Sequence, residues 1–272
     1  MLTGVNQTAV ITLRARADEH HRSDRLFADP IAAEWMAQLE WPTQLDSLYR
    51  LRAQNGVALR VAEFDNILTR LIEQGGFTSA IELGCGFSTR GDRLSTLHAD
   101  WTYIDLPPIV AQRDLWRASG QSIAASVTDT AWLDEIEEGP HVFVAEGLLC
   151  YLPRSEVDAL LGRLRQRCPG SIVVADIVGA PDFAQLTEQT TPLGAPLQWH
   201  AAPPFNRVLE TLDLVPIDGF EPDTLFKQAL KRYFSRLDPA DKIKTWWALN
   251  ADKLSEARSG TIVGYLSEVA PL

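Results

Sequence analysis

Apolar side chains in the first quarter of the chain recur at the spacing of α-helices. Within residues 57–73, apolar positions at offsets 0, 4, 7, 11, 14 and 15 form one face of a predicted helix. Gly75-Gly76 is expected to end this helix, and Arg60 lies beside its apolar face near the predicted start. Upstream, Asp29-Pro30 predicts an N-cap followed by a helix of roughly ten residues. We therefore expect residues 1–75 to form a helical cap.

The middle of the chain alternates strand-like apolar runs with helical patterns. The runs at 142–145 and 172–175 are continuously apolar, which is typical of parallel strands covered on both faces. Between them, a helix is predicted over 155–167, capped by Ser155 and stopped by Pro169-Gly170. This alternation predicts an α/β, doubly wound sheet that binds ligands at the carboxyl ends of its strands. The predicted strands are 79–84, 101–105, 121–127, 141–146 and 171–178.

The pattern loosens in the last third of the chain. Residues 179–205 contain five prolines with aromatic residues between them, so a lid or substrate wall and an ordered loop are both open interpretations. Helix is expected over 205–214 and within 223–258, where Trp246-Trp247 would be buried. A final strand is expected over 260–269.

Composition narrows the class of protein. The 272 residues, 46% of them hydrophobic, suffice for one large domain. We expect this domain to consist of a helical cap (1–75), a cofactor-binding core (76–180) and a substrate lid with the C-terminal end of the sheet (181–272). A net charge of −11 disfavours nucleic-acid partners and anionic membranes. The three cysteines have no metal-like spacing, so we expect a reducing compartment, no disulfides and no metal. With no apolar run long enough for a signal peptide or a membrane span, a cytoplasmic protein is expected.

Two strand ends carry the first candidate chemistry. Gly84 and Gly86 follow the first predicted strand and allow a tight turn that a ligand can approach closely. Thr89 stands where a dinucleotide fingerprint has its third glycine, so a purely structural turn is an alternative. Asp105 ends the second predicted strand, 21 positions after Gly84 (105 − 84), where a carboxylate can bind both ribose hydroxyls of a nucleoside. Together they indicate an adenosine-containing ligand.

Acidic residues also follow the later predicted strands. Asp129 precedes Trp132 and could either cap a helix or contact a ligand. Glu146 ends an apolar strand and precedes another apolar run, and a carboxylate in such a setting needs a partner. Asp176 lies within or just after the fifth predicted strand. These residues extend the candidate site along the carboxyl edge of the predicted sheet.

Several motifs in fixed order resemble one known family. Taken together, they resemble the leucine carboxyl methyltransferase family of S-adenosylmethionine-dependent O-methyltransferases, closest to its bacterial branch of tetracenomycin-type polyketide enzymes. The resemblance covers residues 15 to about 178. The motifs are Ala15-Arg16-Ala17, Arg25-Leu26-Phe27-Ala28-Asp29-Pro30, Leu59-Arg60-Val61, residues 81–90, Tyr103-Ile104-Asp105-Leu106-Pro107 and residues 145–152.

The resemblance implies a fold and a set of roles. The fold would be the class I methyltransferase fold: a mostly parallel seven-stranded sheet with helices on both faces and an N-terminal helical cap. Arg60 would bind the methionine carboxylate of S-adenosyl-L-methionine, Asp129 with Thr128 or Thr130 the adenine, and Glu146 the amino end. Tyr151 would lie near the transferred methyl group, and Arg16, or Arg14 by a shifted alignment, would help to close the site. The implied catalytic residues are Tyr151 and Arg16, and the implied cofactor-binding residues are Arg60, Glu82, Gly84, Cys85, Gly86, Asp105, Leu106, Thr128, Asp129, Glu146 and Gly147.

The residue inventory fits methyl transfer to a carboxylate. His20-His21 lie in a charged run that we expect to be exposed, and the other histidines are scattered, so no nucleophile–base pair stands out. A carboxylate acceptor needs no base, because its pKa near ~4 leaves it ionised at neutral pH. We predict a carboxyl O-methyltransferase acting on a small acid, with its oligomeric state open. The alternatives are O-methylation of a hydroxyl or phenol, an NAD-dependent oxidoreductase and a non-catalytic nucleoside-binding protein; methylation of a protein C-terminus is less favoured.

Overall fold

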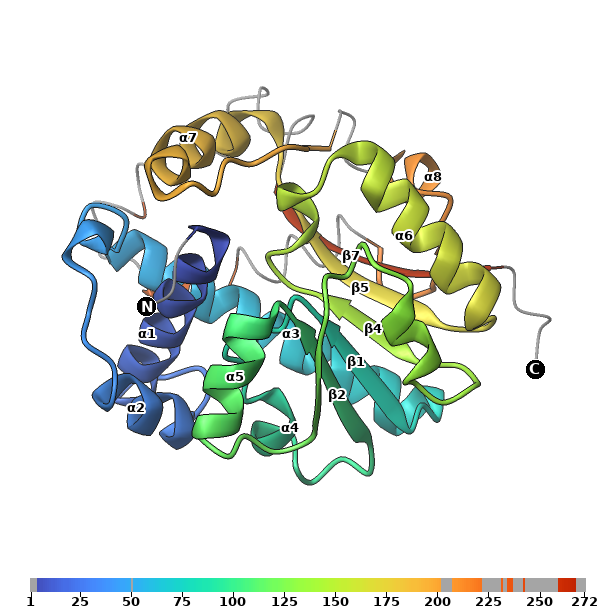
Figure 1. Cartoon of the computed structure of the whole chain (residues 1–272), viewed down its shortest axis with the longest axis horizontal. Coiled ribbons are helices and arrows are strands. Elements are labelled where there is room, and N and C mark those ends of the chain that lie inside the picture. The colour runs from blue at the N-terminus through green and yellow to red at the C-terminus, as the bar shows by residue number, and fades with distance from the viewer. Residues whose placement is uncertain are drawn as a thin grey trace. The chain divides into compact units, whose positions relative to one another are not determined.

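The computed structural model describes residues 4–49, 51–201, 207–221, 231, 234–236, 242 and 259–267. Its strands form a seven-stranded sheet in the order β3-β2-β1-β4-β5-β7-β6. The chain divides into two compact units, Met1–Glu135 and Ile136–Leu272. The α/β fold expected from the sequence, with a mostly parallel sheet of seven strands, is confirmed (Figure 1).

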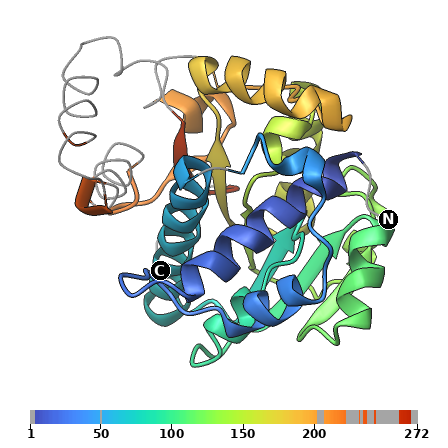
Figure 2. The ribbon, with the colours of Figure 1, turned by 90° about the vertical axis from the view of Figure 1, so that its left-hand side faces the viewer.

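Among the described residues, three α-helices precede the first strand of the first unit: α1 (Thr8–His20), α2 (Pro30–Ala37) and α3 (Leu51–Gly75), with 3-10 helices at Gly4–Gln7 and Thr43–Leu45. Asp29 caps α2 as predicted, because its side chain accepts the N–H of Ala32. Helix α1 packs against both α2 and α3, and two views show it beside α3 (Figures 1 and 2). Helix α3 begins at Leu51, so Arg60 lies nine positions inside it and not near its start (60 − 51). Asn55 and Gly56, which favour turns in isolation, lie inside α3. Packing of the helix against its neighbours outweighs that preference.

The strands of the first unit are parallel. They are β1 (Ser79–Leu83), β2 (Asp100–Asp105) and β3 (Gln121–Ala124), with β2 in the centre. Leu83 pairs with Ile104, so the ends of β1 and β2 lie in register. Two helices connect these strands, α4 (Arg90–Arg93) and α5 (Pro107–Leu115), and a short 3-10 helix (Ala131–Asp134) follows β3. The carboxyl ends of β1 and β2 therefore present their following turns at one edge.

The second unit contains the other four strands. Parallel strands β4 (Val142–Ala145) and β5 (Ile172–Ile177) are joined by helix α6 (Arg154–Arg167). The predicted late strand is present as β7 (Gly260–Tyr265), and it runs antiparallel to both β5 and β6 (Val215–Pro216). Its described residues also form 3-10 helices at Leu149–Tyr151 and Thr191–Leu193 and the helices α7 (Ala180–Thr190) and α8 (Val208–Thr211).

Several predicted boundaries in the second unit were wrong. Pro153, not Ser155, is the N-cap residue of α6, and the helix begins at Arg154. The loose pattern after residue 178 contains helix α7, because Pro181 falls in its first turn, where proline needs no N–H partner. Helix α8 is only four residues long. Trp246-Trp247 and most of the predicted helix at 223–258 lie outside the described residues. In the part of the chain that is described, no helix has the length and apolar character to cross a bilayer.

Candidate functional site

The turn after β1 has the conformation that its glycines permit. Gly84 and Gly86 have φ angles of 61° and 53°, in the left-handed region that side chains disfavour. The N–H of Cys85 donates to the carbonyl of Ile104 at 3.1 Å, which ties the turn to β2. A Cβ on Gly86 would lie 3.3 Å from the Cβ of Ala9, so the start of α1 packs against the turn. The backbone conformation therefore favours glycine at position 86, and a side chain there would also lie tightly against Ala9.

Asp105 lies at the end of β2, directly beside this turn. One carboxylate oxygen accepts the N–H of Gly86 at 2.6 Å, and the other accepts the N–H of Leu106 at 2.7 Å. Burial raises the pKa of Asp105 above its usual value, although the two backbone N–H groups and Arg113 act against that rise. The structure thus brings the glycine turn and the predicted ribose-binding carboxylate into direct contact.

Two buried arginines hold the carbonyl groups that follow the glycines. Arg16 of α1 donates to the carbonyl of Phe87, and Arg113 of α5 donates to the carbonyl of Ser88 at 2.7 Å. The Arg113 guanidinium also lies 4.0 Å from the ring centroid of Tyr103. We call residues 84–89 the glycine loop. Its backbone is fixed from two sides by cations that the sequence pattern does not connect with it.

Arg16, to which the resemblance assigns a catalytic role, is buried and ion-paired. Its side chain is 4% exposed, and Nη1 donates to Asp29 at 3.0 Å and to Thr89 at 2.8 Å. The alternative, Arg14, is more exposed: its Nε donates to Asp18 at 3.0 Å, and its guanidinium lies 5.5 Å from the Trp41 ring. The Arg16 guanidinium is thus buried against the glycine loop.

Glu82 and Cys85 are buried beside the same loop. One Glu82 oxygen accepts from Arg90 and from the Ser88 hydroxyl, each at 2.9 Å. A cofactor contact by Glu82 would be additional to these partners. Burial raises the pKa of the Cys85 thiol well above its usual value.

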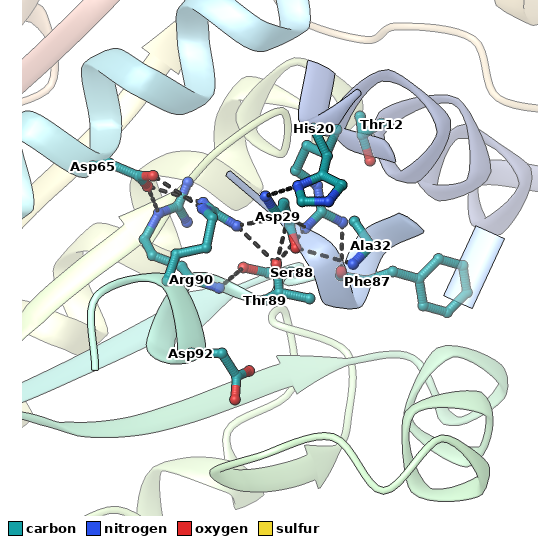
Figure 3. Close-up of polar contacts among 12 residues, drawn as sticks. Thr12, His20, Asp29, Ala32, Asp65, Phe87, Ser88, Thr89, Arg90 and Asp92 are labelled. Carbon is teal, nitrogen blue, oxygen red and sulfur yellow. Dashed lines mark hydrogen bonds and ion pairs between the residues drawn. The ribbon is translucent and has the colours of Figure 1, made fainter. Parts of the chain in front are cut away.

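A network of arginines and carboxylates surrounds the loop (Figure 3). Asp29 accepts from Arg93 at 3.1 Å and from the Thr89 hydroxyl at 2.7 Å. Asp65 of α3 accepts from Arg90 at 2.8 Å and from Arg93 at 2.9 Å. Burial opposes ionisation of Asp29, but its arginine neighbours outweigh burial and lower its pKa. Only the Asp29-Pro30 capping signal could be read from the sequence.

The predicted adenine-binding residues lie in the turn after β3. The Thr128 and Ser126 hydroxyls hydrogen bond at 2.8 Å, and the N–H of Asp129 donates to the carbonyl of Ser126 at 3.0 Å. The next helical turn has Thr130 as its N-cap residue, so Asp129 does not occupy the capping position. Its exposed side chain leaves ligand contact as the prediction for this residue.

The second unit holds the other predicted residues. Gly147 follows β4 with a φ of 67°, and its N–H donates to the carboxylate of Asp176 at 2.6 Å. A strand-end carboxylate thus fixes the turn after a neighbouring strand, as Asp105 does in the first unit. Tyr151 packs with Phe183 of α7 against a small buried cluster of Cys150, Val178 and Leu197. The half-buried Glu146 lies in the turn that Asp176 holds.

Three of the histidines, His20, His141 and His200, have side chains that contact backbone groups. His20 is half-buried, contrary to the expected exposed run, and its Nδ1 accepts the N–H of Asp29 at 3.2 Å. His141 Nε2 lies 2.9 Å from the carbonyl oxygen of Glu137, and His200 Nδ1 lies 3.2 Å from that of Ala201. His21 is exposed, as predicted. These contacts do not form a nucleophile–base pair.

Comparison with known proteins decides the family. The profile of the family described as leucine carboxyl methyltransferase matches residues 8–165, more than half of the chain. The chain belongs to this family. The family match includes the glycine loop, Asp105 and the Glu146-Gly147 turn, together with the three N-terminal helices.

Individual relatives agree with this assignment. The chain is 27% identical over 209 residues to the tetracenomycin polyketide synthesis O-methyltransferase TcmP of Streptomyces glaucescens, covering 73% of this chain and 76% of that protein. It is 30% identical over 217 residues to a predicted S-adenosyl-L-methionine-dependent methyltransferase of Parafrankia sp., and the match covers 70% of this chain and 69% of that protein.

Solved structures share the fold. A predicted methyltransferase from Thermobifida fusca superposes with a TM-score of 0.57 at 16% identity, covering 97% of this chain and 94% of that one. A DUF574 family protein from Streptomyces avermitilis superposes with a TM-score of 0.60 at 12% identity, covering 97% of both chains. At these identities the likeness concerns the fold alone.

Proposed function

We propose that this family member transfers the methyl group of S-adenosyl-L-methionine to a carboxylate of a small-molecule acceptor, forming a methyl ester. The coarser part, an S-adenosyl-L-methionine-dependent methyltransferase, rests on the family and on relatives named for that activity. The observation that carries the proposal is the contact between the glycine loop and Asp105. That contact joins the two features expected of a nucleoside site.

The residues present fit such a cofactor. Each Asp105 oxygen accepts one backbone N–H, and a carboxylate oxygen has a second lone pair with which to accept a ribose hydroxyl. The missing side chain at Gly84 lets a ligand approach the loop backbone. We assign Leu106 to the ribose side, Arg60 to the methionine carboxylate, and Thr128 with Asp129 to the adenine. Glu146 and Gly147 are assigned to the amino end and Tyr151 to the methyl-transfer region.

The chemistry asked of the protein is modest. The bound cofactor supplies an electrophilic methyl group on a sulfonium. The chain has to hold the acceptor oxygen in line with the sulfur–methyl bond and exclude water, and orientation of this kind can supply ~7–11 kcal/mol of a barrier. A carboxylate needs no base, whereas a hydroxyl acceptor needs one more urgently. In the part of the chain that the structure describes, the side chains of His20, His141 and His200 contact backbone groups, and a carboxylate acceptor is compatible with that arrangement.

The acceptor class can be tested by the stability of the product. Purified enzyme should label small aromatic and polyketide-like acids when supplied with methyl-labelled S-adenosyl-L-methionine. Mild base should release the label as methanol, because esters hydrolyse and methyl ethers do not. Matched compounds with the carboxyl replaced by a carboxamide, and every hydroxyl kept, are the control. Base-stable label on the carboxamides would show hydroxyl methylation and contradict the proposal.

A further inference from the structure

Thr89 replaces the third glycine of a dinucleotide-binding fingerprint, and the structure shows what its side chain does. Its hydroxyl is completely buried and has three charged partners. It accepts from Arg16 and from Arg93, each at 2.8 Å. It donates to Asp29 at 2.7 Å, and Figure 3 shows Thr89 beside Asp29. A glycine would leave all three groups without this contact. The hydroxyl links the glycine loop to α1, to the N-cap of α2 and to α4.

This hydroxyl lies in a cluster of buried charges. Among the described residues, ion pairs connect three arginines and three carboxylates across α1, the N-cap of α2, α3, α4 and β1. Buried charges are tolerated when they are paired and hydrogen bonded, and removal of one member exposes the others to a desolvation cost. The cluster consists of Arg16, Arg90, Arg93, Asp29, Asp65 and Glu82.

Helix α1 contacts the glycine loop at three points. Ala9 packs against Gly86, Arg16 donates to the carbonyl of Phe87, and Arg16 also donates to Thr89. These contacts fix the loop backbone and one of its side chains from the same helix. Movement of α1 away from the loop would break all of them together. The conformation of the loop and the docking of α1 are therefore parts of one arrangement.

We propose that Thr89, Arg16 and Asp29 are positioning residues that hold the glycine loop in its cofactor-binding conformation and couple the docking of α1 to cofactor binding. Arg16 then acts through the loop and does not touch the acceptor, which replaces its predicted catalytic role. Coupling of this kind is reciprocal, so a cofactor that prefers the fixed loop also stabilises the docked helix. The inference rests on the proposed function, because it takes the glycine loop as the cofactor site.

The test is Thr89→Val, which keeps the shape of the side chain and removes the hydroxyl. Calorimetry should show roughly tenfold weaker binding of S-adenosylhomocysteine, an effect on the order of one hydrogen-bond contribution to charged groups. S-adenosylhomocysteine is the cofactor after methyl transfer. Hydrogen exchange should show that it protects the amides of α1 in the parent and protects them much less in the variant. Thr89→Ser, which restores the hydroxyl, should recover the affinity.

A matched control is Thr69→Val, since the Thr69 hydroxyl donates to the backbone carbonyl of Asp65 within its own helix, at 2.8 Å. It should leave the affinity for S-adenosylhomocysteine unchanged. If Thr89→Val does not fold, Arg16→Lys takes its place, because a lysine cannot reproduce the planar fork that contacts the loop. An affinity equal to the parent's, with lowered thermal stability only, would overturn the proposal. A fall in kcat at saturating cofactor with unchanged affinity would also overturn it.

Exchange without ligand separates this inference from the proposed function. In the ligand-free variant, α1 and the glycine loop should exchange faster together, while β2 stays as protected as in the parent. A parent that binds no S-adenosylhomocysteine would refute the proposed function, and this comparison would still decide whether the hydroxyl couples the helix to the loop. Equal exchange of α1 and the loop in the parent and the variant would overturn the coupling.

Discussion

Replacing Asp29 with alanine should lower the free energy of unfolding by about 3–5 kcal/mol, the cost typical of removing one partner from a buried ion pair. Asp29 is fully buried and accepts from Arg16, Arg93, Thr89 and the N–H of Ala32. Its loss would remove one counter-charge from each of two buried guanidinium groups, although Arg93 would keep Asp65, and it would remove the cap of α2. Because the substitution combines both losses, it should destabilise the fold more than removal of a helix cap alone.

Denaturant unfolding of the parent and the variant measures this loss. The control is Asp24→Ala, because Asp24 is exposed and pairs at 2.8 Å with Arg22 at the surface. Exposed pairs contribute little, so this variant should unfold at nearly the denaturant concentration of the parent. An Asp29→Ala variant as stable as the Asp24→Ala variant would show that the buried cluster does not hold the first unit together.

The difference in free energy of unfolding between the parent and Asp29→Ala should depend on pH in a defined direction. Burial alone would raise the pKa of Asp29, but Arg16, Arg93 and hydrogen bonds lower it below its usual value. A lowered pKa in the folded state stabilises the fold above the unfolded pKa of about 3.9. That contribution is lost as pH falls through the folded pKa. The stability gap between the parent and Asp29→Ala should therefore narrow only below about pH 4.

Replacing Asp105 with alanine should weaken cofactor binding about 100-fold or more. Two hydrogen bonds from ribose hydroxyls to a charged carboxylate contribute ~1.5–3 kcal/mol each, and every 1.4 kcal/mol is about tenfold in affinity. The substitution also removes the acceptor for the N–H of Gly86 and loosens the glycine loop. The loss should exceed that of Thr89→Val, because Asp105 is assigned to direct contact.

Calorimetric titration with S-adenosylhomocysteine measures the effect. Asp114→Ala is the matched control, since Asp114 is an exposed residue on the helix that follows Asp105. It should bind the product as tightly as the parent does. If Asp105→Ala also bound within threefold of the parent, the ribose assignment would be wrong.

Local signals in the sequence were sufficient to predict the glycine turn and to single out Asp105 at the end of the next strand. The glycines, the two apolar strands and the spacing to Asp105 all depend on positions close in the chain or on register between adjacent strands. In the structure, the N–H of Gly86 donates to the Asp105 carboxylate, so the two features lie together. Asp29-Pro30 was equally informative, because an N-cap acts within one turn of helix.

The buried cluster could not be predicted in the same way. Arg16 and Thr89 are separated by 73 positions, and Asp29 and Thr89 by 60, so no periodicity connects them. Charged residues within an amphipathic pattern normally lie on the solvent-exposed face of an element. In this cluster, tertiary packing buries them as ion pairs. Helix α7 was missed for a different reason: proline signals a break in most contexts, but not in the first turn of a helix.

The central claim is that the glycine loop and Asp105 form a site for S-adenosyl-L-methionine. The most direct measurement is calorimetric titration of the purified full chain with S-adenosyl-L-methionine, S-adenosylhomocysteine and NAD in parallel. We predict micromolar binding of the first two and none of NAD. Binding of NAD alone, or of none of the three, would contradict the claim.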